Sequence, residues 1–193
     1  MTGHVRYTAL LDACVLYPIV TADALMSLTA AGLFAAKWTR RIENEWISNL
    51  EADRPDLKDR LDRRRDTMRK AVPDWEVTAS AWQAIQIRLK LPDPDDEHVI
   101  AAAVAGHADC IVTANIKDFP NSITAPLGLE AVHPDPFIIA QWDLDPIATI
   151  HAFKQMRARW RHPNASAVEF ADRFERAAMP LVGSRLRQAA ELI

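Results

Sequence analysis

Apolar and polar positions along the chain alternate between two kinds of segment. Short apolar runs occupy residues 7–11, residues 110–113 and the surroundings of Val132, and each has the length of a buried strand. Between these runs, apolar residues recur at helical spacing, as at Trp46 and Leu50. Because helices alternate with short strands, the pattern predicts an α/β fold in which helices flank a central, mainly parallel β-sheet.

Helix starts are marked by capping residues. Thr39 precedes one amphipathic pattern and is expected to be its N-cap. Asp93-Pro94 predicts a second helix start, with Asp at the cap and Pro in the first turn. Ser166, which is followed three residues later by Glu169, forms a capping-box pattern for a helix in the tail.

The tail from about residue 141 differs in pattern from the chain before it. It lacks a strand signal and predicts two or three helices. We therefore expect two units, residues 1–140 and a C-terminal helical extension at residues 141–193. The segment between Asp145 and Glu169 has no acidic residue, but it carries Lys154, Arg157, Arg159 and Arg161.

Length, composition and charge are those of an ordinary globular protein. The chain has 193 residues, of which 49% are hydrophobic and 25% charged, and its formal net charge is −3. This charge does not indicate a nucleic-acid binder, so a basic surface would have to be local. Cys14 and Cys110 are too few for a disulfide scaffold or a zinc cluster, and we interpret both as buried thiols. We see neither a signal peptide nor a membrane span, which predicts a cytoplasmic protein.

Two of the apolar runs are followed by a carboxylate. Asp12 ends the first run, and Asp118 comes shortly after the run at 110–113. Sites in open parallel sheets form beyond the carboxyl ends of the strands, so both acids are expected at the same edge. The alternative is purely structural, because polar residues generally follow buried strands and Asp caps helices well.

Further acids lie on predicted helices. Glu45 stands beside the apolar face of its helix and is expected at the edge of the core, whereas Glu43 points elsewhere. Asp95, Asp96 and Glu97 crowd one first helical turn, where amide hydrogens and the helix dipole favour acids without any function. Three consecutive acids nevertheless exceed what capping requires.

Four segments resemble the motifs of PIN-domain proteins in order and spacing. They cover residues 11–18, 32–45, 91–103 and 108–119. Each motif alone is a weak signal, but four in order are fairly specific, and the resemblance extends over roughly residues 7–140. It implies a set of metal-binding, catalytic acids, which are Asp12, Glu45, Asp96 and Asp118. It also implies two polar residues that support them, Thr113 and Asn115.

One of these assignments keeps an alternative. Asp96 is preferred because it stands four residues before Ile100, where the acid of the family usually lies, but Asp95 or Glu97 would also offer a carboxylate in this turn.

Motifs in the tail restrict the resemblance to one group of PIN-domain proteins. Residues 157–163, Glu169-Phe170, Arg173 and Pro180-Leu181 resemble a helical extension of VapC-type toxins, which belong to bacterial type II toxin–antitoxin pairs. The resemblance implies an endoribonuclease that hydrolyses RNA with Mg²⁺ or Mn²⁺, a cognate antitoxin as partner, and a homodimer. Hard divalent ions held by carboxylate oxygens suit the attack of water on a phosphodiester.

An RNA substrate would also need contacts to its phosphates. The candidate residues for these contacts are Arg40, Arg41, Arg157, Arg159 and Arg161. We interpret the arginines at 63–65 as a solvated helix face and Trp160 as a core anchor rather than a base-stacking residue. Neither His98 nor His107 has a metal-ligand partner at convincing spacing.

Two other functions are compatible with parts of the pattern. A haloacid-dehalogenase phosphatase also has an Asp after its first strand, but it needs a second Asp two residues later, where this chain has Cys14. A PIN fold without activity, serving as a scaffold or an RNA-binding module, would not need all four acids. A small DNA-binding protein encoded alongside would favour the toxin.

Overall fold

The computed structural model describes residues 6–85, 91, 93–160 and 165–193. Its strands are short, and helices and 3-10 turns join them along the chain. The elements are β1 (Thr8–Leu11), α1 (Ala13–Leu16), α2 (Ile19–Ala30), β2 (Ala35–Lys37), α3 (Arg40–Asp53), η1 (Pro55–Leu57), α4 (Lys58–Ala71), α5 (Ala79–Ala84), η2 (Pro94–Asp96), α6 (Glu97–Ala105), β3 (Cys110–Val112), η3 (Ile116–Asp118), α7 (Asn121–Thr124), η4 (Ala125–Leu127), β4 (Glu130–Val132), α8 (Pro134–Leu144), α9 (Pro146–Arg159), α10 (Ala167–Arg176) and α11 (Pro180–Gln188).

The strands form one parallel sheet in the order β2-β1-β3-β4. Ala9 of β1 pairs with Ala36 of β2 on one side and with Cys110 of β3 on the other. β1 and β3 were predicted because nearly all their side chains are buried, which produces continuous apolar runs. β2 was not predicted, because it is only three residues long and its place is set by pairing with β1. The predicted α/β class is confirmed.

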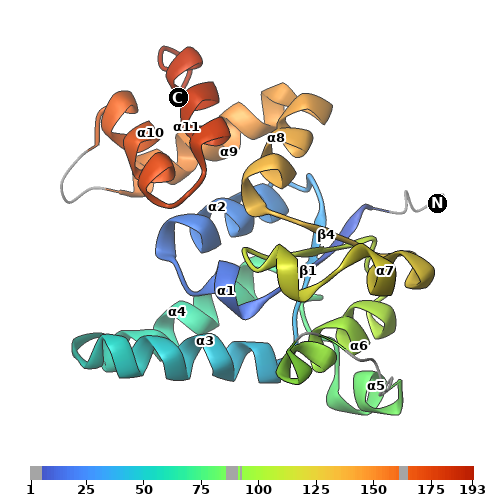
Figure 1. Ribbon diagram of the computed structural model, residues 1–193. Coiled ribbons are helices and arrows are strands. Elements are labelled where there is room, and N and C mark those ends of the chain that lie inside the picture. Colours follow the sequence, from blue (N-terminus) through green and yellow to red (C-terminus); the bar gives the residue numbers. More distant parts are fainter. Residues whose placement is uncertain (1–5, 86–90, 92, 161–164) are drawn as a thin grey trace.

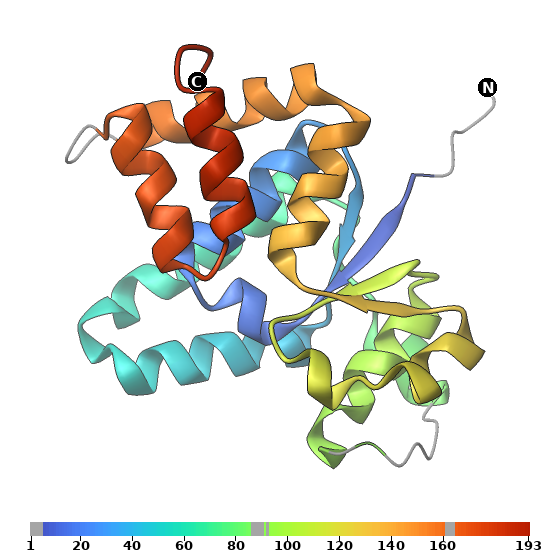
Figure 2. The same ribbon diagram turned by 45° about the horizontal axis from the view of Figure 1, so that its top comes forward.

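Helices surround this sheet, and the C-terminal helices gather at one end of the molecule (Figures 1 and 2). α6 packs against β1 and β3, and α2 packs against β2. α9 and α10, orange and red in Figure 1, pack in turn on α2. Among the described residues, none of the helices combines the length and the apolar character needed to cross a membrane.

Aromatic packing and one buried carboxylate hold the C-terminal helices together. Phe153 and Phe174 meet edge to face with ring centroids 5.5 Å apart. Asp135 of α8 is buried, and its two oxygens accept the backbone N–H groups of Leu181 and Val182 at 3.0 and 2.9 Å. These bonds satisfy free amide groups in the first turn of α11 and fix that helix to α8.

The predicted N-caps are present in the structure. The Thr39 hydroxyl caps α3, the Asp93 carboxylate caps η2, and the capping box at Ser166 begins α10, as expected. α8 spans Pro134–Leu144, so the expected boundary between residues 140 and 141 falls inside this helix. The division into two units stays a prediction.

Candidate metal site at the carboxyl edge of the sheet

Asp12 follows β1 directly and caps α1. Its Oδ1 accepts a hydrogen bond from the Ala13 backbone N–H at 2.6 Å, and its Oδ2 accepts one from the Thr113 hydroxyl at 2.8 Å. The backbone N–H of Asp12 donates to the Val112 carbonyl of β3. Asp12 is only 5% exposed, so two neighbouring strands fix a buried carboxylate at the edge of the sheet.

Cys14 lies beside this carboxylate. Its thiol donates to Asp12 Oδ2 at 3.0 Å and lies 3.3 Å from the Thr113 hydroxyl, while the Ala114 N–H donates to its sulfur at 3.2 Å. Burial, together with the charge of Asp12, raises the pKa of Cys14 to about 12, so the thiol keeps its proton at neutral pH. Cys14 was predicted to be a buried core thiol, but it is only partly buried against the core and is also a hydrogen-bond donor to Asp12.

Glu45 of α3 faces His98 in the first turn of α6. Glu45 Oε1 lies 3.0 Å from His98 Nε2 and accepts a hydrogen bond from Arg41 Nε at 3.1 Å. Burial alone would raise the pKa of Glu45, but the contacts with His98 and Arg41 outweigh burial and lower it. Glu45 is therefore a fixed carboxylate that is ionised at neutral pH.

His98 is itself almost fully buried. Its side chain is 3% exposed, and its Nδ1 has no hydrogen-bond partner among the described residues. His98 Nε2 faces Glu45 Oε1 and donates to it, so this contact orients the carboxylate. The imidazole of His98 therefore contacts Glu45 and does not face the solvent.

Asp96 is half-buried where η2 passes into α6. Burial contributes most to its raised pKa of about 6, and the charges of Asp12, Asp93 and Asp118 add to it. The carboxylate therefore lies in a field of negative charge that is incompletely balanced. Such a field favours a bound cation.

A cavity of about 500 Å³ opens at this edge of the sheet, and we call it the acidic cavity. Asp12, Glu45, Asp53 and Asp96 are its carboxylates, and no basic residue is among the described residues that line it. The predicted supporter Asn115 also lines it, and its backbone N–H donates to the Thr113 hydroxyl at 3.0 Å. Asp118 does not line the cavity, although its charge acts on Asp96.

The donor chemistry of the acidic cavity fits a hard divalent cation, because its charged lining groups are all carboxylates. The carboxylates do not, however, surround one point closely. Within the described part of the chain, no three His, Cys, Asp or Glu side chains are close enough together to hold one ion as they stand. Of the predicted ligands, Asp12, Glu45 and Asp96 line the acidic cavity, whereas Asp118 acts on it only through its charge on Asp96.

The raised pKa of Asp96 predicts a pH-dependent stability. Folding favours the protonated carboxyl, so its stabilising contribution is complete below the unfolded value of 3.8 and is lost as the pH rises through about 6. Without metal, wild type should therefore gain more stability than Asp96→Asn when the pH falls from about 7.5 to about 5. Thermal unfolding in EDTA measures this difference. Equal gains in both proteins would contradict the raised pKa.

The arginines that were predicted to bind RNA have different partners in the structure. Arg40 pairs with Glu76, with Nε 2.7 Å from Oε1, and Arg41 pairs with Glu45. Arg159 donates to Asp23 at 2.7 Å, and it also reaches Ser27. Arg157 is half-buried in the last turn of α9. Arg161 lies outside the described residues, and RNA contact by any of these arginines stays a prediction.

Trp160 behaves as the expected core anchor. Its Nε1 donates to Asp23 Oδ2 at 2.8 Å, and its ring packs edge-on against Phe170 with centroids 5.0 Å apart. The Arg173 guanidinium covers the ring at 4.9 Å from its centroid. These contacts tie the end of α9 to α2 and α10.

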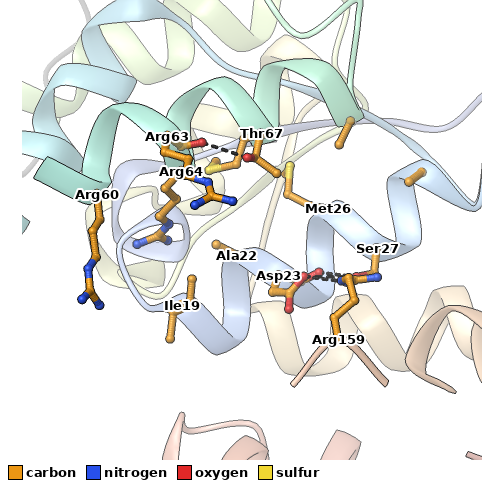
Figure 3. A pocket seen from close by; sticks show the side chains of 13 residues that line it. Ile19, Ala22, Asp23, Met26, Ser27, Arg60, Arg63, Arg64, Thr67 and Arg159 are labelled. Atoms are coloured by element: carbon orange, nitrogen blue, oxygen red, sulfur yellow. Dashed lines mark hydrogen bonds and ion pairs between the residues drawn. The ribbon is translucent and has the colours of Figure 1, made fainter. Parts of the chain in front are cut away.

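A separate groove of about 400 Å³ lies between α2 and α4, with arginines along its α4 side (Figure 3). Arg64 in this groove is half-buried and donates to the backbone carbonyls of Leu16 and Tyr17. Its guanidinium lies 4.6 Å from the Trp46 ring centroid, and burial lowers its pKa to about 10. The prediction of a solvated face at residues 63–65 is therefore wrong for Arg64, because α4 packs this side chain on the end of α1.

Two residues that touch the candidate acids, Cys14 and His98, were not predicted from the sequence. Cys14 was expected only in the core, and His98 was set aside because no second metal ligand stood at a suitable spacing. Each lies two residues after a predicted acid, Asp12 or Asp96, in a first helical turn. Proximity to Asp12 was the signal available in the sequence for Cys14, whereas the contact of His98 with Glu45, on another helix, had no local signal.

Comparison with known protein families matches two parts of the chain. The model of the family described as PIN domain matches residues 8–117, which is more than half of the chain, and the chain therefore belongs to this family. The model described as VapC50 C-terminal domain matches residues 134–188. The predicted combination of a PIN domain and a VapC-type C-terminal extension is confirmed.

A curated relative carries the same name as the second family. "Putative ribonuclease VapC50" of Mycobacterium tuberculosis (strain ATCC 25618 / H37Rv) is 48% identical to this chain over 54 residues. The match covers 28% of this chain and 32% of the relative, so it spans about a third of the relative's length. No solved structure matches the chain.

Proposed function

We propose that this protein is a divalent-metal-dependent endoribonuclease and the toxin component of a VapC-type toxin–antitoxin pair. The observation that carries this proposal is the acidic cavity at the carboxyl edge of a PIN-family sheet, which has four carboxylates and no basic side chain among the described residues of its lining. The name of the relative, a ribonuclease, supports an RNA substrate. The reaction is hydrolysis of an RNA phosphodiester bond.

The proposed ligands of Mg²⁺ or Mn²⁺ are Asp12, Asp96, Asp118 and Glu45. When bound, such an ion supplies charge neutralisation at the scissile phosphate and lowers the pKa of a coordinated water. The protein residues around the ligands orient them. Thr113 and Cys14 donate to Asp12, and His98 and Arg41 fix Glu45.

This role of His98 predicts a graded effect of substitution. His98→Ala should lower metal-dependent cleavage by roughly 10- to 100-fold, as is typical when the hydrogen-bond partner of a metal ligand is removed. His98→Gln should restore part of the loss, because the amide N–H₂ can donate to Glu45 in place of Nε2.

Cleavage rates and Mn²⁺ affinity by calorimetry measure the effect of each variant. His151→Ala, at an exposed position of α9, is the control for a loss of imidazole alone. If His98→Ala cleaves and binds metal like this control, His98 does not position Glu45.

The partners belong to the same proposal. A cognate antitoxin would bind the toxin and mask its acidic cavity, and the toxin would act in the cytoplasm as a homodimer. Co-expression with the product of an adjacent gene for a small DNA-binding protein tests the first part, because a stable complex should lose ribonuclease activity. Light scattering of the isolated protein tests the homodimer.

The enzymatic activity is tested with a mixed pool of single-stranded RNA. Cleavage that requires Mg²⁺ or Mn²⁺ and stops with EDTA is the expected result, with a single-stranded DNA pool as the comparison. Calorimetry with Mn²⁺ shows separately whether the protein binds metal. A protein that neither cleaves RNA nor binds metal would be the alternative, a PIN-fold scaffold or RNA-binding module without activity.

A further inference from the structure

A second cavity, of about 580 Å³, adjoins the acidic cavity along α3. The two cavities share two lining residues, Glu45 and Asn49, so they are neighbouring parts of one cleft. We call the second one the amide cavity. The side chains that characterise it are Arg40, Arg41, Asn44, Ser48, Asn49 and Trp82.

The helical period of α3 explains why these residues line a common wall. One face of the helix is buried through Ile42, Trp46 and Leu50, and it anchors α3 to the core. The residues of α3 that line the two cavities follow one another at spacings of three and four beside this buried face, which places them in a row. This row runs from Arg40 past Glu45 to Asp53, about 20 Å at the rise of an α-helix. α3 therefore forms a continuous wall for both cavities.

The charges of the amide cavity are balanced, unlike those of the acidic cavity. Arg40 is paired with Glu76, and Arg41 is paired with Glu45. Because each guanidinium has a carboxylate partner, the lining offers little net charge to a phosphate. The planar faces of the guanidinium groups stay available for stacking, since Arg40 is 68% exposed and Arg41 is 45% exposed at the side chain.

The remaining polar groups of the amide cavity are uncharged. The side chains of Asn44, Ser48 and Asn49 are exposed and make no hydrogen bond to other described side chains or backbone groups. An Asn amide offers two donors and one acceptor with two lone pairs, and Ser offers a donor and an acceptor. Trp82 is buried, lines the cavity and adds an apolar surface. Neutral hydrogen-bonding groups beside planar and apolar surfaces suit a planar, neutral, polar ligand.

We propose that the amide cavity is a binding subsite for a nucleobase of single-stranded RNA, adjacent to the phosphate that the acidic cavity receives. This inference rests on the proposed ribonuclease function, because it assigns the neighbouring nucleotide of the same substrate. Single-stranded RNA is recognised by stacking on aromatic or guanidinium planes and by hydrogen bonds to base edges, and both kinds of group are present here. Asn44, Ser48 and Asn49 select the base, and the paired arginines stack on it.

Binding is tested without cleavage by using Asp12→Asn protein. The probes are the four ribonucleoside 5′-monophosphates, followed by RNA trinucleotides of single sequence. Side-chain amide signals of Asn44 and Asn49 are followed by NMR and assigned by replacing each residue with Ala. The expected result is that these two signals shift with one or two of the bases and stay in place with the others. Equal shifts with all four bases, or no shift of either signal, would overturn the proposal.

Selectivity is tested by sequencing the ends of the products from a mixed RNA pool. Asn44→Ala/Ser48→Ala should relax the base preference beside the cut by on the order of tenfold, because each lost hydrogen-bonding group removes discrimination between bases. The two positions are exposed on a helix, and Ala favours helix, so the variant should fold. Gln155→Ala on α9 removes a distant exposed amide and should keep the wild-type preference.

The outcomes separate this inference from the proposed function. Shifted amide signals without any cleavage by wild type would support the base-binding subsite and overturn the proposed ribonuclease function. Cleavage with an identical base preference in wild type and Asn44→Ala/Ser48→Ala would overturn the subsite and leave the ribonuclease standing.

Discussion

Asp12→Asn is expected to reduce RNA cleavage by at least about a hundredfold while the protein stays folded. A hundredfold is the upper range for losing an outer partner of a metal ligand, and the loss of a ligand should exceed it. The fold should survive because Asn caps helices as well as Asp and can still accept the Ala13 N–H through its amide oxygen. Initial rates on the RNA pool and far-UV circular dichroism measure the two effects.

Asp53→Asn is the matched control for this prediction. Asp53 lines the same acidic cavity, but it is exposed and its Oδ2 accepts a hydrogen bond from the Tyr17 hydroxyl at 2.7 Å. It was not among the acids predicted from the sequence, and its substitution should leave cleavage nearly unchanged. If both variants keep wild-type rates, the cleavage comes from a contaminating nuclease or from another site. If both variants lose activity, cleavage depends on the total negative charge of the cavity rather than on the position of Asp12.

The carboxyl edge of the sheet was predictable from the sequence because it is defined by short apolar runs and by the residues that directly follow them. The runs that became β1 and β3 are apolar at nearly every position, and in a parallel sheet that pattern places Asp12 and Thr113 side by side. The capping residues Thr39 and Asp93 were predictable for the same reason, since a cap bonds to a backbone group within three residues.

Contacts between distant elements were not predictable from one sequence. The bond between Glu45 and His98 joins α3 to α6, and nothing local in either helix reports it. Arg64 looks like its neighbours in a charged helix, and only the place of Trp46 and the end of α1 makes it half-buried. β2 is only three residues long, which is too short to be distinguished from a loop before its pairing with β1 is known.

Substitution of Glu43 is expected to have the largest effect on the free energy of unfolding. Its side chain is 2% exposed, and it accepts hydrogen bonds from Arg69 of α4 and from the Trp38 indole N–H at 3.5 Å. The Arg69 guanidinium lies 4.8 Å from the centroid of the Trp75 ring, which stacks on Trp38. Glu43 thus connects α3, α4 and the end of β2, and this connection holds the helix that carries Glu45.

Glu43→Ala should lower the free energy of unfolding by about 3–5 kcal/mol, because it leaves a partly buried guanidinium and a buried indole N–H without their acceptor. Urea unfolding followed by tryptophan fluorescence measures this change. Asp56→Ala is the control, since Asp56 pairs with Arg54 where both side chains are more than half exposed, and its loss should leave the free energy of unfolding nearly unchanged. A Glu43→Ala cost as small as that of the control would show that Arg69 turns to solvent without penalty, and that the packing of tryptophans, rather than the ion pair, holds α3 in place.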